Sequence, residues 1–82
     1  MSTTKEVHIK ILEISKKYLS GHPQIHINSI AEELGITKDR LTEQITTLKN
    51  LNLIEFIDPG NDMIVLTDFG KFASLDEEGT TV

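Results

Sequence analysis

The apolar residues near the start of the chain recur at intervals of three and four positions. This spacing is that of a helix with one buried face. It predicts a first helix over residues 4–19, whose buried face is formed by Val7, Ile11, Ile14 and Tyr18 and widened by Leu12 and Leu19. His8 lies beside this face, and we interpret it as a boundary residue rather than a metal ligand.

A second helix is predicted after Gly21 and Pro23, which end the first one. Glycine accepts left-handed backbone, and the residue before a proline is kept out of the helical region. A short extended piece over residues 24–27 comes next. The second helix is then capped by Asn28 and ended by Gly35.

The third helix is the best-defined element of the pattern. Thr37 is a suitable N-cap, and Asn52 accepts the left-handed conformation that often closes a helix. Between these two residues the buried edge is formed by Leu41, Ile45 and Leu48.

Two short β-prone runs follow, over residues 54–57 and 63–67. Pro59 and Gly60 lie between them at the positions of a type II turn, so the pattern predicts a hairpin. Thr67 can then cap a last short helix that runs through Phe69, Phe72 and Leu75. The aromatic side chains are interpreted as part of the core: Tyr18, Phe56, Phe69 and Phe72.

The chain has 82 residues, which is enough for one small domain. The predicted fold class is mainly α with a small β-hairpin. Residues 1–75 are expected to form one domain that consists of a three-helix bundle, the hairpin of residues 54–67, called the wing below, and a short C-terminal helix. Residues 76–82 offer nothing to bury, and we expect them to form an acidic, disordered tail.

Three stretches of the chain carry motifs of one known family. Residues 27–37 resemble an I-x-x-L-A-x-x-L-G-I-S/T signature. Residues 41–54 resemble a V-x-x-x-L-x-x-L-x-x-x-G-L-I run, and residues 66–70 an L-T-x-x-G entry into the last helix. By these motifs the chain resembles the winged helix-turn-helix regulators, and the MarR-like ones in particular. The resemblance covers residues 7–75. It implies a winged helix-turn-helix fold and a role in DNA binding and transcription regulation.

The resemblance further implies that the third helix enters the major groove of duplex DNA. Hydroxyl and amide groups on its outward face can contact phosphates or base edges, and its basic side chains can contact phosphates. The candidate DNA-contacting residues are Thr37, Lys38, Arg40, Thr42, Thr46, Thr47 and Asn50.

The distribution of charge supports a different reading. Residues 28–68 contain three basic and eight acidic side chains, so this segment by itself carries the formal charge of −5 of the whole chain. Acidic side chains repel phosphate. The alternative function is therefore a protein–protein interaction module that does not bind DNA, with an acidic surface for a basic partner formed by Asp39, Glu43, Asp58 and Asp62. A continuous positive stripe from Lys5, Lys10, Lys16 and Lys17 to Lys38 and Arg40 would instead favour DNA.

Other kinds of function have little support in the sequence. The chain has no cysteine, and Pro23 keeps His22 and His26 from sharing a helical face, so we expect no metal site and no cofactor. No nucleophile triad or glycine-rich phosphate loop is visible, so we expect no enzyme. Without a long apolar run or a signal peptide, we expect a cytoplasmic protein with no membrane contact. Ile9, on the polar side of the first helix, could contribute with Leu12 and Lys16 to a homodimer contact.

Overall fold

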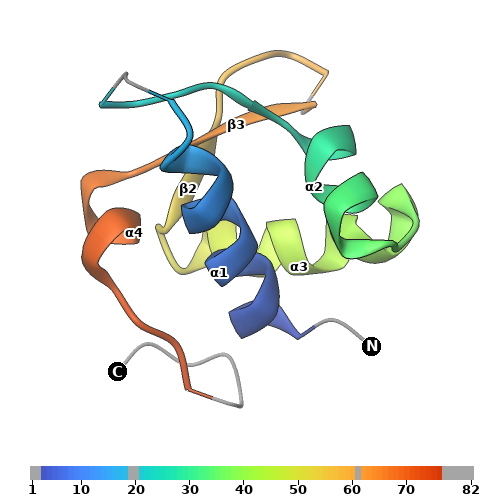
Figure 1. Cartoon of the computed structure of the whole chain (residues 1–82), viewed down its shortest axis with the longest axis horizontal. Helices are drawn as coiled ribbons and strands as arrows, with labels where there is room; N and C mark the ends of the chain where they lie inside the picture. Colours follow the sequence, from blue (N-terminus) through green and yellow to red (C-terminus); the bar gives the residue numbers. More distant parts are fainter. Residues whose placement is uncertain (1–2, 19–20, 61, 77–82) are drawn as a thin grey trace.

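The computed structural model describes residues 3–18, 21–60 and 62–76 of the chain. In these residues the fold is mainly α, with a small three-stranded antiparallel sheet (Figure 1). The elements in chain order are α1 (Thr4–Ser15), β1 (Ile25–His26), α2 (Ile27–Leu34), α3 (Lys38–Asn50), β2 (Ile54–Phe56), β3 (Met63–Leu66) and α4 (Asp68–Phe72). The predicted fold class is confirmed, and the order of helices and strands is consistent with a winged helix-turn-helix.

Most of the predicted helix ends are confirmed. The hydroxyl of Thr37 accepts a hydrogen bond from the backbone N–H of Arg40 at 3.3 Å and begins α3. Thr67 does the same for α4, where it accepts from the N–H of Gly70 at 2.9 Å. Gly35, with φ of 68°, closes α2 in the left-handed conformation. Asn52, with φ of 65°, has the left-handed backbone expected after α3.

The start of α2 differs from the prediction, because the helix begins at Ile27 and not after Asn28. Its N-cap is His26, which makes no side-chain capping hydrogen bond. The backbone N–H of Ile27 donates instead to the carbonyl oxygen of Asp62 at 2.9 Å. The wing therefore satisfies an amide at the start of the helix that a capping side chain would otherwise have to satisfy.

The extended piece before α2 is a strand of the sheet, which makes the predicted two-stranded hairpin incomplete. The strand order is β1-β3-β2, and both pairs are antiparallel. Ile25 of β1 is paired with Ile64 of β3, and both side chains are buried. The wing is thus attached to the helices by backbone pairing as well as by the connection from α3 to β2.

The predicted type II turn in the wing is wrong. Such a turn needs positive φ at Gly60, but among the described residues only Gly35 and Asn52 have positive φ. The carboxylate of Asp58 shapes the turn, because it accepts from the backbone N–H of Asp62 at 3.0 Å and from that of Met63 at 2.9 Å. A side chain that binds the backbone a few residues on is a common alternative to a regular turn.

The core is aliphatic and is shared by α1, α2, α3 and the sheet. In the view of Figure 1, α2 and α4 lie to either side of α1. The buried apolar residues include most of the predicted aliphatic helix positions and the inward positions of the strands: Val7, Ile11, Ile14, Ile25, Ile27, Ile30, Ala31, Leu41, Ile45, Leu48, Leu53, Ile54, Ile64, Leu66 and Leu75.

The prediction of an aromatic core is wrong for most of the aromatic residues. Phe72 is 85% exposed, Phe69 and Tyr18 are each 52% exposed, and Phe56 is half-buried. Helix α1 ends at Ser15, before Tyr18; Leu19, the predicted end, lies outside the described residues. The short helix α4 buries its backbone at Gly70 rather than its two phenylalanine rings. It ends at Phe72, so the prediction that it continues through Leu75 is wrong: Ala73 has extended backbone, and Leu75 is buried in the segment after the helix.

His8 is buried, at 2% exposure, so its interpretation as a boundary residue is wrong. Its Nε2–H donates to the carbonyl oxygen of Gly70 at 2.8 Å and joins α1 to α4. A buried imidazole is tolerated here because its polar atom has a partner.

Residues 77–82 of the predicted acidic tail lie outside the described residues, and Asp76 is exposed. Within the described ranges, no helix is long and apolar enough to cross a membrane.

Candidate nucleic-acid interface

Helix α3 turns one edge to the core and leaves the rest of its surface open. Leu41, Ile45 and Leu48 are buried, and Gln44 is half-buried, where its Oε1 accepts from the hydroxyl of Thr4. All of the predicted DNA-contacting residues are exposed: Thr37, Lys38, Arg40, Thr42, Thr46, Thr47 and Asn50. The structure therefore brings them to one accessible helix surface.

The middle of that surface carries two carboxylates. At about 100° per residue, the positions opposite the buried edge are those of Asp39, Glu43, Thr46 and Asn50. The carboxylates of Asp39 and Glu43, both exposed, thus lie in the centre of the outward face. Arg40 and Lys49 lie about a quarter turn to either side of that line.

The three threonines of α3 use their hydroxyl protons within the helix. The Oγ1–H of Thr42 donates to the carbonyl oxygen of Lys38 at 2.8 Å. Those of Thr46 and Thr47 donate four residues back as well, to Thr42 at 2.9 Å and to Glu43 at 3.1 Å. Such back-bonding leaves the hydroxyl oxygen as an acceptor only. In this conformation, therefore, these side chains do not donate hydrogen bonds to phosphate.

Lys38, at the start of α3, is bound to the wing. Its Nζ lies 2.7 Å from Oδ1 of Asp62, and each side chain is 49% exposed. The hydrogen bond and the charge of Asp62 raise the pKa of Lys38, and the charges of Asp39 and Asp58 raise it further. Three of the four predicted acidic residues therefore act on this one cation.

The carboxylate of Asp58 has a structural partner rather than an open surface. The backbone N–H of Met63 lowers the pKa of Asp58, and that of Asp62 does so to a smaller extent. Of the acidic set predicted to bind a partner, Asp39 and Glu43 are thus exposed on α3, whereas Asp58 and Asp62 are half-buried in contacts within the protein.

At least three of the six cations in the predicted positive stripe are held in ion pairs. Besides Lys38, the Nζ of Lys10 lies 2.9 Å from Glu13 and that of Lys17 lies 3.4 Å from Glu33. The first of these pairs raises the pKa of Lys10 and lowers that of Glu13. The stripe that would have favoured DNA is therefore interrupted by acidic partners, and the sequence pattern could not reveal the contact between residues 17 and 33.

His22 and His26, the two histidines considered as metal ligands, lie in different surroundings. The Nδ1 of His22 lies 3.4 Å from the carbonyl oxygen of Leu66, and its Nε2 lies 3.5 Å from Oδ1 of Asp68. His26 is exposed at the end of β1. Over the part of the chain that the structure describes, no group of three or more His, Cys, Asp or Glu side chains is placed to hold a metal ion.

Comparisons with protein-family models, with curated proteins and with solved structures find no match to this chain.

Proposed function

We propose that this chain is a winged-helix protein that binds duplex DNA through α3 and regulates transcription, as the MarR-like resemblance implies. The observation that carries the proposal is the placement of Arg40 and Lys49, exposed on opposite flanks of α3. They are about 14 Å apart along the helix axis, at 1.5 Å per residue. The major groove admits a helix along its length, so a helix lying there would turn one of these two flanking cations to the phosphates of each wall.

The centre of α3 would then contact base edges that donate hydrogen bonds. The carboxylates of Asp39 and Glu43 can only accept hydrogen bonds. The hydroxyl of Thr46 can also only accept one from DNA, because it donates its own proton to the carbonyl oxygen of Thr42. In the major groove the donors are the N4 amino group of cytosine and the N6 amino group of adenine. Asn50 can both donate and accept, and suits an adenine. The expected preference is for sites that present these amino groups to α3.

Binding is tested by fluorescence anisotropy with labelled duplexes at low salt, where attraction to phosphate is strongest. Arg40→Ala and Lys49→Ala should each weaken binding to all duplexes and reduce the salt slope by about one. Lys71→Ala is the matched control, because Lys71 lies on α4, outside α3 and outside the predicted positive stripe, and should leave the affinity nearly unchanged. Unaltered anisotropy of the wild-type protein with random duplexes at low salt would exclude the proposal.

A second candidate function, an acidic module for a basic protein partner, is favoured by a specific observation. Asp39 and Glu43 are both exposed and lie four residues apart on α3, so their carboxylates are on neighbouring positions of one helix face. A partner's lysine or arginine could bind both of them. Calorimetric titration with a lysine- and arginine-rich peptide tests this candidate. Glu43→Lys should abolish the heat of binding, whereas unchanged affinity would count heavily against an acidic docking surface.

The cytoplasmic location expected from the sequence remains part of the proposal, since the ligand would be genomic DNA.

A further inference from the structure

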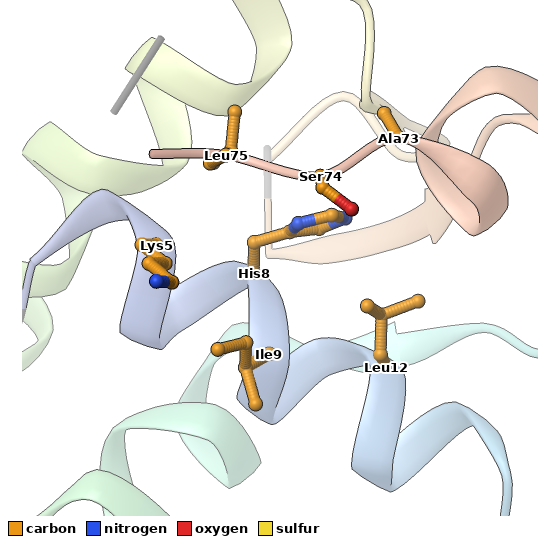
Figure 2. Close-up of a pocket in the computed structure, with 7 residues that line it drawn as sticks. All are labelled: Lys5, His8, Ile9, Leu12, Ala73, Ser74 and Leu75. Atoms are coloured by element: carbon orange, nitrogen blue, oxygen red, sulfur yellow. The ribbon is translucent and has the colours of Figure 1, made fainter. Parts of the chain in front are cut away.

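A small pocket lies between α1 and the segment that follows α4 (Figure 2). Its volume is about 120 Å³, and most of its lining is apolar: Ile9, Leu12, Ala73 and Leu75. The imidazole of His8 and the hydroxyl of Ser74 add polar groups to this lining. In Figure 2 the imidazole extends from α1 towards Ser74 on the other wall. The pocket is therefore an apolar space with a few polar groups at its wall.

The imidazole of His8 has one nitrogen that the fold uses and one that it does not use. Its Nε2–H donates to the carbonyl oxygen of Gly70 at 2.8 Å, and His8 makes no other hydrogen bond or ion pair within the described residues. A buried imidazolium without a carboxylate partner is costly, so the ring is neutral. Because Nε2 carries the proton, Nδ1 has a lone pair and acts as an acceptor. This acceptor has no donor.

The lone pair of Nδ1 opens into the pocket. His8 is only 2% exposed, yet in the described part of the chain no fully buried side-chain nitrogen or oxygen lacks a hydrogen-bond partner. Nδ1 must therefore be reachable from outside, and the pocket is a space that His8 lines. An acceptor at the wall of an apolar pocket favours a ligand that brings a donor, because any other ligand leaves the acceptor buried and unsatisfied.

We infer that this pocket binds a small neutral alcohol, whose hydroxyl donates to Nδ1 of His8 while its hydrocarbon part contacts Ile9 and Leu12. A cavity of roughly 150 Å³ accepts benzene, so a pocket of about 120 Å³ suits a molecule of about five non-hydrogen atoms, such as n-butanol. The hydroxyl of Ser74 on the other wall can donate to the oxygen of the same alcohol.

Other small ligands fit these groups less well. A hydrocarbon, an ether or a carboxylate brings no donor for Nδ1 of His8. A cation would meet no carboxylate among the residues that line the pocket. Lys5 also lines it but has an interaction within the protein. The pocket residues belong to α1 and to residues 73–75, not to α3 or the wing, so this site is independent of the proposed DNA binding.

An NMR titration of the ¹⁵N-labelled full chain with n-butanol tests the inference. The backbone amide signals of Ile9, Ala73 and Leu75 should shift and saturate, with a dissociation constant of about 10 mM for so small a ligand. The ¹⁵N signal of Nδ1 of His8 should shift with the same dissociation constant, because this nitrogen accepts the new hydrogen bond. Methyl propyl ether is the matched probe, since it has the same number of non-hydrogen atoms but no donor. It should bind about fivefold more weakly.

A variant that fills the pocket provides an independent check. Ala73→Leu puts a larger apolar side chain into the space and leaves His8 and Gly70 unchanged, so it should weaken butanol binding at least about tenfold. Ile57→Ala, which removes an apolar side chain of the wing that is 41% exposed, should leave the dissociation constant unchanged. Circular dichroism shows whether each variant is folded.

Two results with the wild-type protein overturn the inference whatever the variants do. One is a titration in which the signals of the pocket residues do not saturate, or in which the Nδ1 signal of His8 does not move. The other is an ether that binds as tightly as the alcohol, because the unused acceptor would then select nothing. A folded Ala73→Leu variant with unchanged affinity for butanol also overturns it.

Discussion

The side chains of Lys38 and Asp62 join the first residue of α3 to the wing, with Nζ and Oδ1 2.7 Å apart. The pair spans 24 positions of the chain and holds one of the predicted DNA-contacting cations against a wing carboxylate. Any phosphate that approaches Lys38 must compete with Asp62. The contact therefore weakens the attraction of Lys38 to phosphate, and it holds the wing beside α3.

Asp62→Asn should release Lys38 while keeping the size of the side chain. If α3 binds DNA, affinity for duplex at low salt should rise about three- to fivefold, the scale of an exposed ion pair. The salt slope should steepen by about one as a phosphate contact is gained. Anisotropy titrations at several salt concentrations measure both quantities. Asp68→Asn removes an equal charge at α4, and an equal gain in that variant would mean that the ion pair does not compete with phosphate.

The carboxylate of Asp58 should make the stability of the wing depend on pH. Its pKa in the folded state is lowered chiefly by the N–H of Met63. Its contribution is therefore fully present above the unfolded pKa of about 3.9, and is lost as the pH falls through the lower folded pKa. Thermal unfolding of wild type and Asp58→Asn should show a higher midpoint for wild type at pH 7. The gap should narrow below about pH 4; a gap that stays constant into strong acid would contradict this role.

Gly70→Ala should destabilise the protein although alanine is the better helix former. A Cβ on Gly70 would lie 1.9 Å from the carbonyl oxygen of Leu53, a backbone atom that also accepts from the N–H of Thr67. Relieving the clash must displace α4 from the start of β2, at a cost of about 2–3 kcal/mol. Chemical denaturation measures this loss. Gly21→Ala is the matched control, because its Cβ would meet nothing within 4 Å and its change should stay within about 0.5 kcal/mol.

Substitution of His8 should separate a hydrogen bond from packing. His8→Ala leaves a cavity and a buried carbonyl oxygen of Gly70 without its donor, and should cost about 2–4 kcal/mol. His8→Gln can still offer an N–H to that oxygen and should recover part of the loss. Equal unfolding free energies for the two variants would show that the hydrogen bond contributes nothing beyond the filled volume.

The local signals of the sequence identified much of this fold. The structure confirms the threonines that begin α3 and α4 and the left-handed conformation of Gly35 and Asn52. Each of these features depends on only a few consecutive residues. The aliphatic edge of α3 is confirmed for the same reason, since a period of 3.6 residues is visible within one helix. The outward face of α3, with its candidate contacts, follows directly from that edge.

Contacts between distant parts of the chain could not be predicted from these local signals. The two-residue strand β1 exists only because β3 lies beside it, and the start of α2 depends on a carbonyl oxygen of the wing. The phenylalanines of α4 were predicted as core from their apolar character, but the close approach of Gly70 to Leu53 leaves those rings outside. The same holds for Glu33 and Asp62, the partners of Lys17 and Lys38, which lie 16 and 24 positions away along the chain.

The sequence by itself determined the aliphatic helices, their caps and the concentration of negative charge in residues 28–68. Each of these depends on spacing within one element or on composition. Only the tertiary structure decided which cations remain available and which apolar rings remain uncovered. The reason is that ion pairing and burial depend on distances between side chains from different elements, and those distances are fixed only when the helices and the wing pack together.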